Sequence, residues 1–579
     1  MSIPNTASVG GRPSTPIDEI ANAYFEGVLR LSPCYLTSLG RPERQDEYDD
    51  FSPAGLAARA ALNRETLGRL AEVSPVDDID RVTLAAMRER LGLDLEIFEA
   101  GADLLSINNI ATSLHVIRGV YDQMPTATEE DWRVITRRLR AVPAAVDGWA
   151  ESQRAAVERG LLPARRQVNQ LAEQLEQWTA TGGFLDGLRS GARLADQMPL
   201  APELAAELSA AVEVARGAFS GAAELLRGEL HDAGTDVDGV GVQRYRLMSR
   251  ASLGANIDLT ETYRWGLAEV ARIQELERQT AERIKPGASI AEAVELLDAD
   301  ENYRLHGTDA LREWMQGKAD EAVTALADVH FDIPEPVRRI ECCIAPTTDG
   351  GIYYTGPSED FSRPGRMWWA VPEDVQDFST WRELTTVYHE GVPGHHLQIG
   401  QTAYRSELLN LWRRHGCWVS GHGEGWALYA EWLMADLGFQ DDPGNLMGLL
   451  DGQMLRAVRV VIDIGLHCGA ELGLTAPELV GGGEWTFDKA WAYFNRYVFM
   501  DEGFARFEVN RYCGWPGQAP SYKLGERLWL QLRDEVRAAQ GEAFSLKDFH
   551  RTALDIGGVG LDVLREAVLA AYGAGPALP

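Results

Sequence analysis

Residues 380–398 read TWRELTTVYHEGVPGHHLQ, and the fold of the middle of the chain depends on this stretch. Thr380 and Glu383 match a capping box, in which the Thr side chain caps the start of a helix and the Glu side chain reaches back. Apolar residues follow at helical spacing, so we expect a helix that continues through His389. The Gly-Val-Pro-Gly segment at 391–394 predicts a kink or bulge directly after it, because proline and glycine disrupt a regular helix.

The sequence on both sides of this stretch is rich in Ala, Leu, Glu and Arg, with apolar residues three and four positions apart. This spacing places the apolar side chains on one face of a helix and therefore predicts a mostly α fold. It recurs through the first half of the chain, in residues 53–70, 80–100, 130–159, 202–228 and 259–285.

One region departs from helical spacing. Residues 351–371, GIYYTGPSEDFSRPGRMWWAV, place two aromatic, β-prone patches on either side of a turn rich in Gly, Pro, Asp and Ser. The pattern predicts a short β-ribbon beside the helix that carries His389. For the domain organisation we expect a flexible tail over residues 1–16, an N-terminal helical lobe over 17–340, and a second helical lobe, which carries the chemistry, over 341–579.

The composition excludes several classes of partner. Among the 579 residues there are 55 Lys and Arg but 87 Asp and Glu, so the formal net charge is -32. Such a chain lacks the basic surface that binds nucleic acid or an anionic membrane, and we expect neither partner. No apolar stretch is long enough to span a membrane, and the Ser-, Pro- and Gly-rich start lacks the apolar core of a secretory signal. The expected location is therefore the cytoplasm, where the six scattered cysteines stay reduced.

Five of the 11 histidines lie close together in the sequence, at positions 389, 395, 396, 415 and 422. In an H-E-x-x-H motif, two histidines one helical turn apart bind zinc, but here the position four after His389 is Pro393. A straight helix would place His396 about 10 Å further along its axis, too far to share a metal ion with His389. The Gly- and Pro-rich break can bring a histidine back. We favour His395 as the second ligand, with His396 as the alternative ligand or as a residue that supports the ligands.

Two glutamates downstream can complete the metal site. Residues 421–431, GHGEGWALYAE, open a second helix. Glu424 lies at its start beside flexible glycines, which makes it the better candidate for a third ligand. Glu431 follows seven residues later on the same face and could orient a ligand histidine through the free N–H of its ring. Two histidines, one carboxylate and an open fourth position are typical of a catalytic zinc site.

The same residues carry a resemblance to a known family. HEGVPGHHLQ at 389–398 and EGWALYAE at 424–431 resemble the DUF885 family, whose members look like zinc-dependent helical metallopeptidases related to angiotensin-converting enzyme. The resemblance implies a large zincin-like helical body with a deep central cleft, and one Zn²⁺ ion per chain on His389, His395 and Glu424. Further matches are spread over most of the chain, in SPCYLTSLG (32–40), DFSRPG (360–365), RAVRVVIDIGLH (456–467) and RYCGWPGQAPSYKLG (511–525).

These residues suggest a mechanism for the hydrolysis of peptide bonds. Glu390 stands beside the metal ligands and would take a proton from the attacking water, then return it to the leaving amine. By the resemblance, Tyr522 is placed to stabilise the oxyanion. Arg511 or Lys523 would hold a carboxylate of the substrate, and Tyr512 is a further candidate for the cleft.

We therefore expect a metallohydrolase that cleaves short peptides, because a deep site in a helical body excludes folded proteins. A zinc amidase that acts on a small non-peptide amide would use the same water chemistry, and this alternative stays open. The third alternative is a non-catalytic metal-binding protein. Glu390 argues against it, because a structural site needs no carboxylate that does not bind the metal. Nothing in the sequence indicates the oligomeric state.

Overall fold

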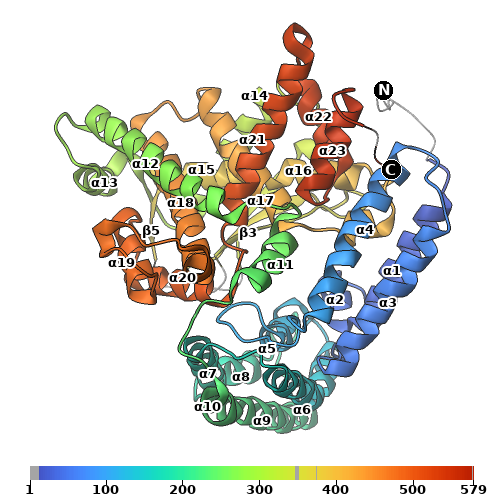
Figure 1. The fold of residues 1–579 in the computed structure, drawn as a ribbon. Helices are drawn as coiled ribbons and strands as arrows, with labels where there is room; N and C mark the ends of the chain where they lie inside the picture. The colour runs from blue at the N-terminus through green and yellow to red at the C-terminus, as the bar shows by residue number, and fades with distance from the viewer. Residues whose placement is uncertain (1–11, 346–350, 373–374, 577, 579) are drawn as a thin grey trace.

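The computed structural model describes residues 12–345, 351–372, 375–576 and 578. Helices make up most of the structure (Figure 1), which confirms the mostly α prediction. Among the described residues, none of the helices is both long enough and apolar enough to cross a membrane. The first part of the chain contains α1 (Pro16–Leu31), α2 (Pro33–Ser38), α3 (Pro53–Ala71), α4 (Asp78–Glu99), α5 (Ser113–Gly119), α6 (Glu129–Glu158), α7 (Arg165–Thr179), α8 (Phe184–Ser190), α9 (Pro202–Leu225) and α10 (His231–Ala233).

The segment from α5 to α10 forms a helical bundle with its own hydrophobic core, drawn at the bottom of Figure 1. Its longest helix, α6, begins with a capping box between Thr128 and Asp131 and packs along α9. The inner face of α6 is apolar and buried, since Trp132, Leu139 and Trp149 are each 3% exposed or less. This bundle contains none of the predicted site residues.

The main hydrophobic core draws on both ends of the chain. Helices α1, α3 and α4 contribute to it together with the second half of the protein, where α12 packs against α18 and α17 packs against α21. The lobe boundary at residue 340 stays a prediction, but the main core includes residues on both sides of it. The later helices are α11 (Val242–Leu253), α12 (Leu259–Ile284), α13 (Ile290–Ala299), α14 (Thr308–Leu326), α15 (Thr380–Glu390), α16 (His395–Tyr404), α17 (Ser420–Asp436), α18 (Pro443–Leu472), α19 (Phe487–Tyr497), α20 (Glu502–Gly514), α21 (Ser521–Gln540), α22 (Leu546–Ile556) and α23 (Leu561–Ala571).

The folded part of the chain includes Arg12, which lies within the segment 1–16 that was expected to be a flexible tail. Residues 1–11 of that tail lie outside the described residues. The guanidinium group of Arg12 donates to Asp18 at 2.5 Å and to Asp77 at 2.6 Å, and it also contacts Asp80. Because this guanidinium group contacts carboxylates at the starts of both α1 and α4, the chain from Arg12 onward belongs to the folded body.

The predicted β-ribbon is confirmed, and it belongs to a larger sheet. β3 pairs antiparallel with β4, with Ile352 opposite Trp369, and β2 adds a parallel third strand on the other edge of β4. Met367 and Trp369 of β4 share a small hydrophobic core with α14 and α15. The sheet therefore packs against α15, the helix that carries His389 and Glu390. The strands are β1 (Arg304–His306), β2 (Ile340–Ile344), β3 (Ile352–Thr355), β4 (Gly365–Trp369) and β5 (Asp377–Ser379).

The predicted capping box at Thr380 and Glu383 is wrong. Ser379 occupies the N-cap position of α15, and no side chain caps this helix. The physical reason is that β5 pairs with β1 up to Ser379, so the chain passes directly from strand to helix. The Thr380 hydroxyl instead donates to the carbonyl oxygen of Tyr303 at 3.1 Å, which ties the start of α15 to the segment before β1.

Candidate metal centre

The predicted break in the central helix is a turn between two separate helices. α15 ends at Glu390, and α16 begins at His395 after the four residues 391–394. Within this turn the backbone N–H of Gly394 donates to the carbonyl oxygen of Tyr388 at 3.1 Å. The chain folds back so closely that the rings of His389 and His395 lie 4.9 Å apart, centroid to centroid, at an angle of 89°.

Gly394 permits this turn because its backbone lies against the end of α15. A Cβ atom at position 394 would come within 1.9 Å of the carbonyl oxygen of His389, far inside a van der Waals contact. Trp426 of α17 holds the turn from the other side, since its indole N–H donates to the carbonyl oxygen of Pro393 at 2.8 Å. Trp426 is fully buried, so it fixes the turn against the helix that carries Glu424.

Glu424, near the start of α17, faces both histidine rings. Its Oε2 atom is 3.4 Å from Nε2 of His389 and 3.6 Å from Nε2 of His395. Ligand atoms that lie about 2.0–2.1 Å from a tetrahedral zinc ion are roughly 3.3 Å from one another, so these two separations match the edges of such a site. The donor set of two imidazoles and one carboxylate therefore suits zinc in its chemistry and in these two carboxylate–imidazole separations.

Glu431 orients the ring of His389. The Nδ1–H group of His389 donates to Oε1 of Glu431 at 2.7 Å, and the Thr385 hydroxyl donates to the other carboxylate oxygen at 2.8 Å. Because Nδ1 carries the proton in this arrangement, the lone pair of Nε2 is free on the side of Glu424. Glu431 is 1% exposed, so water does not compete for this hydrogen bond.

The carboxylates of the site favour a positive charge between them. Burial alone would lower the pKa of His389, but its hydrogen bonds to Glu424 and Glu431 outweigh burial and raise the pKa to about 10. Burial alone would raise the pKa of Glu424, but its hydrogen bonds with His389 and His395 hold it well below its usual value. The same negative charge that stabilises a proton on the imidazole also stabilises a metal cation.

Glu390 lies beside the candidate ligands without pairing with them. Glu390, His389 and His395 offer donor atoms within 4.8 Å of one another, yet among the described residues only Glu424 and Glu431 form ion pairs with these histidines. Burial raises the pKa of Glu390 above its usual value, against the opposing charges of the two histidines. Glu424 is thus the carboxylate that pairs with both histidine rings, and Glu390 lies beside them without an ion pair to either.

His396, the alternative ligand, is engaged elsewhere through both ring nitrogens. Its Nε2–H donates to the carbonyl oxygen of Val337 at 2.7 Å, and its Nδ1 accepts from the Tyr354 hydroxyl at 2.9 Å. Burial lowers the pKa of His396 to about 4, so the ring is neutral at pH 7. His396 therefore links α16 to the β-sheet, and the structure brings His395 rather than His396 to His389.

Tyr522 lies at the start of α21, which packs against α17, the helix of Glu424. Burial raises the pKa of Tyr522, and the negative charge of Glu424 raises it further. The guanidinium carbon of Arg459 lies 5.0 Å from the centroid of the Tyr522 ring and holds it from α18. The hydroxyl has no hydrogen-bond partner within the part of the chain that the structure describes.

The other three predicted substrate contacts already have partners in the protein. Arg511 and Tyr512 both donate to the carboxylate of Glu508, at 3.0 and 2.6 Å. Lys523 is 1% exposed, and its ammonium group lies 2.8 Å from the carboxylate of Glu526. Arg511 also donates to Gln518, Tyr512 accepts from Arg459 of α18, and Lys523 donates to Gln453 of α18. Because these contacts engage all three side chains, their positions give no support to direct contact with a substrate.

Several residues that support the site were not predicted from the sequence. Thr385 could have been found, because it lies four residues before His389 and therefore on the same face of α15. Glu508 could also have been found, because it lies four residues before Tyr512 on α20. Arg459 leaves no local signal, since it reaches Tyr522 only through the packing of α18 against α21.

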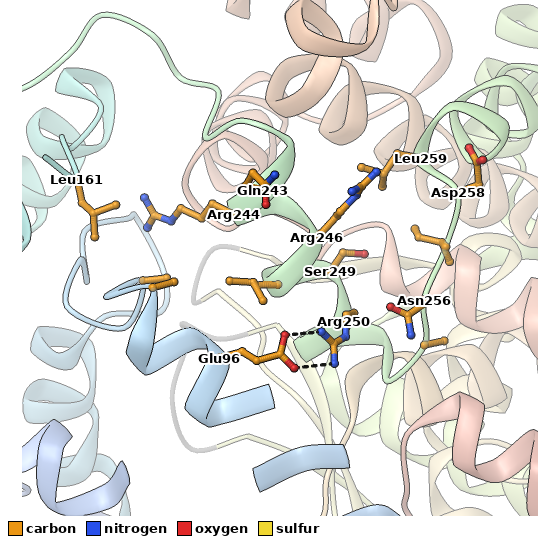
Figure 2. Close-up of a pocket in the computed structure, with 15 residues that line it drawn as sticks. Glu96, Leu161, Gln243, Arg244, Arg246, Ser249, Arg250, Asn256, Asp258 and Leu259 are labelled. Atoms are coloured by element: carbon orange, nitrogen blue, oxygen red, sulfur yellow. Dashed lines mark hydrogen bonds and ion pairs between the residues drawn. The ribbon is translucent and has the colours of Figure 1, made fainter. Parts of the chain in front are cut away.

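A cavity of about 890 Å³ lies along α11 (Figure 2). It lacks the cluster of possible metal ligands found around His389. Its lining includes neither a histidine nor a cysteine, and it shares no residue with the histidine cluster. Arg250 is paired with Glu96 at 2.8 Å, while Arg244 and Arg246 point away from each other in Figure 2. Because its polar groups do not converge, the histidine cluster is the stronger candidate for a functional site.

Comparisons with known proteins identify a family and a fold. A family model described as "Bacterial protein of unknown function (DUF885)" matches residues 33–568, which confirms the resemblance seen in the motifs. None of the curated proteins matches the chain. A solved structure described as "the putative lipoprotein from Colwellia psychrerythraea" has a TM-score of 0.80 at 23% sequence identity, over 96% of this chain and 99% of that chain. Another, "a putative lipoprotein of unknown function from Shewanella oneidensis", has a TM-score of 0.72 at 16% identity, over 96% and 100% of the two chains. At these identities the likeness shows a shared fold.

Proposed function

We propose that this chain, which belongs to the DUF885 family, is a zinc-dependent hydrolase that cleaves the peptide bonds of short peptides. The observation that carries the proposal is the convergence of His389, His395 and Glu424, with Nε2 to Oε2 distances of 3.4 and 3.6 Å. A structural zinc site is closed by four protein ligands, whereas catalytic sites commonly use two histidines and one carboxylate and keep a position for water or substrate.

The chain supplies the groups that a hydrolase of this kind needs. Zinc bound at this site would polarise the scissile carbonyl and make water acidic enough to attack near neutral pH. Glu390, with its raised pKa, accepts the proton of the attacking water and passes it to the leaving amine. The free hydroxyl of Tyr522 donates to the carbonyl oxygen as negative charge develops on it.

Burial of the cluster favours short and flexible substrates. His389, Glu390 and His395 are only 6–7% exposed, so a scissile bond must leave bulk water to reach them. A folded protein cannot present a rigid surface loop at that depth, whereas a short peptide can. The same burial strengthens the electrostatic interactions that stabilise the oxyanion.

The direct test compares wild type with Glu390→Gln on a set of short peptides with free and blocked termini. The substitution keeps the size of the side chain but removes the proton acceptor, so we expect normal zinc content and a rate about 10²–10⁴-fold lower. Glu407→Gln, which changes an exposed glutamate beyond α16, is the matched control and should keep the wild-type rate. An unchanged rate in Glu390→Gln would refute the role of Glu390, and zinc-loaded wild type that cleaves none of the peptides would refute the substrate class.

A further inference from the structure

A second pocket begins beside the candidate metal centre. It encloses about 210 Å³ between the β3–β4 loop, α16 and the start of α17. Gln398, Ile399 and Thr402 line it from α16, three, four and seven residues after His395. Residues at this spacing share one face of a helix, so the face that presents His395 to the cluster continues as the floor of the pocket.

Trp418 lines this pocket and lies close to the histidine cluster. Its ring centroid lies 6.3 Å from that of His395. The indole packs so tightly on Gly423 that a Cβ atom there would come within 2.3 Å of it, and Gly423 directly precedes Glu424. Large aromatic side chains are mostly buried, yet Trp418 is 54% exposed. An apolar surface is thus presented next to the candidate ligands.

The charged side chains around the pocket already have partners within the protein. Arg414 and His415 contact the same carboxylate, Glu359, at 2.7 and 2.9 Å. Arg413 is buried and donates to the Thr83 hydroxyl at 3.2 Å. A ligand therefore meets mainly apolar surface, contributed by Pro357, Ile399, Ala403, Trp418 and Val419.

Arg413 and Arg414 each have a buried Nε atom without a partner among the described residues, although their other nitrogens are bound within the protein. Gln398 is the uncharged residue of the pocket that also has a buried polar atom without a partner. It is 4% exposed, and among the described residues its side-chain carbonyl oxygen has no hydrogen-bond donor. A buried polar atom without a partner costs stability, and a ligand that supplies the missing donor recovers that cost. A peptide group offers an N–H for this oxygen and a C=O for the amide nitrogen, so Gln398 matches the main chain of a peptide.

We propose that this pocket is a specificity subsite that takes one apolar side chain, from the substrate residue beside the scissile bond, while Gln398 binds the peptide group of that residue. The volume fits one side chain, because pockets that hold whole small ligands are typically about 300–1,000 Å³. This inference rests on the proposed hydrolase function and narrows its substrates to peptides with an apolar residue at one cleavage position.

Binding, rather than turnover, tests the subsite. The full chain with the Glu390→Gln substitution, loaded with zinc, is titrated by calorimetry with the N-acetyl amides of glycine, leucine and phenylalanine. We expect the leucine and phenylalanine compounds to bind at least about 10-fold more tightly than the glycine compound, because only they bury an apolar side chain.

Two further substitutions in that background change the pocket in opposite directions. Ala403→Phe fills it and should abolish the advantage of leucine and phenylalanine over glycine. Ile399→Ala enlarges it and should shift the preference towards phenylalanine over leucine. If one variant fails to fold, the other still decides the question.

The possible results distinguish failure of the subsite proposal from failure of the proposed hydrolase function. Equal or undetectable binding of all three compounds, or a selectivity that neither substitution alters, would overturn the subsite and leave the proposed hydrolysis standing. Selective binding that responds to the substitutions would support the subsite even if wild type hydrolysed no peptide. Lack of hydrolysis by wild type would refute the proposed function, not the subsite.

Discussion

His395 and His396 are neighbours in the sequence, but their ring nitrogens have different surroundings. Nε2 of His395 lies 3.6 Å from Glu424, and its buried Nδ1 has no hydrogen-bond partner among the described residues. Both nitrogens of His396 are used, by Val337 and Tyr354. A metal ligand needs a free lone pair, so only His395 of the two can act as one without breaking existing hydrogen bonds.

A first prediction concerns Glu431, which is hydrogen-bonded to the proposed ligand His389. Glu431→Gln weakens the hydrogen bond that orients His389, so we expect the zinc affinity to fall about 10–100-fold while the fold persists. Competition with a fluorescent chelator measures this affinity. Thr385→Val, which removes only the second hydrogen bond to Glu431, should have a smaller effect. Equal affinities in wild type and Glu431→Gln would show that the contact does not support the metal.

A second prediction concerns pH and a residue outside the site. Burial of Glu277, helped by the charge of Asp451, raises its pKa from 4.5 to about 9. The folded state thus keeps a proton that the unfolded chain releases above pH 4.5, and the free energy of unfolding should fall as pH rises towards 9, by up to about 1.4 kcal/mol per pH unit. Glu277→Gln has no carboxyl group to titrate, so its free energy of unfolding should not show this fall with pH.

Urea unfolding at pH 5 and pH 8 measures the effect of this change. We expect Glu277→Gln to be more stable than wild type at pH 8 and nearly equal to it at pH 5. Glu295→Gln, at an exposed position of α13, should show no such difference between the two pH values. A stability gain of the same size at both pH values would mean that the Glu277 carboxyl does not titrate as described.

At the scale of secondary-structure elements, the turn between α15 and α16 decides the site. A third prediction follows from its tight packing: Gly394→Ala should displace the turn, lower the melting temperature and abolish zinc binding, because the added Cβ meets the backbone of His389. Gly217→Ala in α9, where a Cβ meets nothing within 4 Å, is the control and should leave zinc binding unchanged. Normal zinc binding by Gly394→Ala would contradict this account of the turn.

Local patterns predicted some elements and failed for others, for physical reasons. The break after His389 and the ribbon of β3 and β4 were predictable, because glycine, proline and aromatic residues act on the nearby backbone. The capping box at Thr380 failed because β5 pairs with β1, a contact between segments distant in the sequence. The strand β2 was not predicted for the same reason. Its partner is β4, and β3 lies between the two strands in the sequence.

At the scale of the whole molecule, the helical periodicity predicted which segments are helices but not which of them pack together. Residues of α1, α3 and α4 share the main core with the C-terminal helices, whereas the segment from α5 to α10 has a core of its own. An apolar face shows that a helix is buried, but it does not name the partner that covers it. The arrangement of the two cores was therefore beyond reach of the sequence.

The candidate metal centre joins three elements that are separate in the chain. His389 belongs to α15, His395 to α16 and Glu424 to α17. A fourth prediction is that zinc raises the melting temperature, and that the rise grows with zinc concentration, because a metal that binds only the native state stabilises it by mass action. Scanning calorimetry of chelator-treated protein with added zinc measures this. A similar rise in His389→Ala would place the stabilising metal elsewhere.

The zinc content of three proteins shows whether His395, and not His396, helps to bind a zinc ion. Elemental analysis of wild type, His395→Gln and His396→Gln compares two neighbouring histidines that differ in their contacts. We expect about one zinc ion per chain in wild type and in His396→Gln, and almost none in His395→Gln. Absence of zinc from wild type, or its loss from His396→Gln with retention in His395→Gln, would contradict the account.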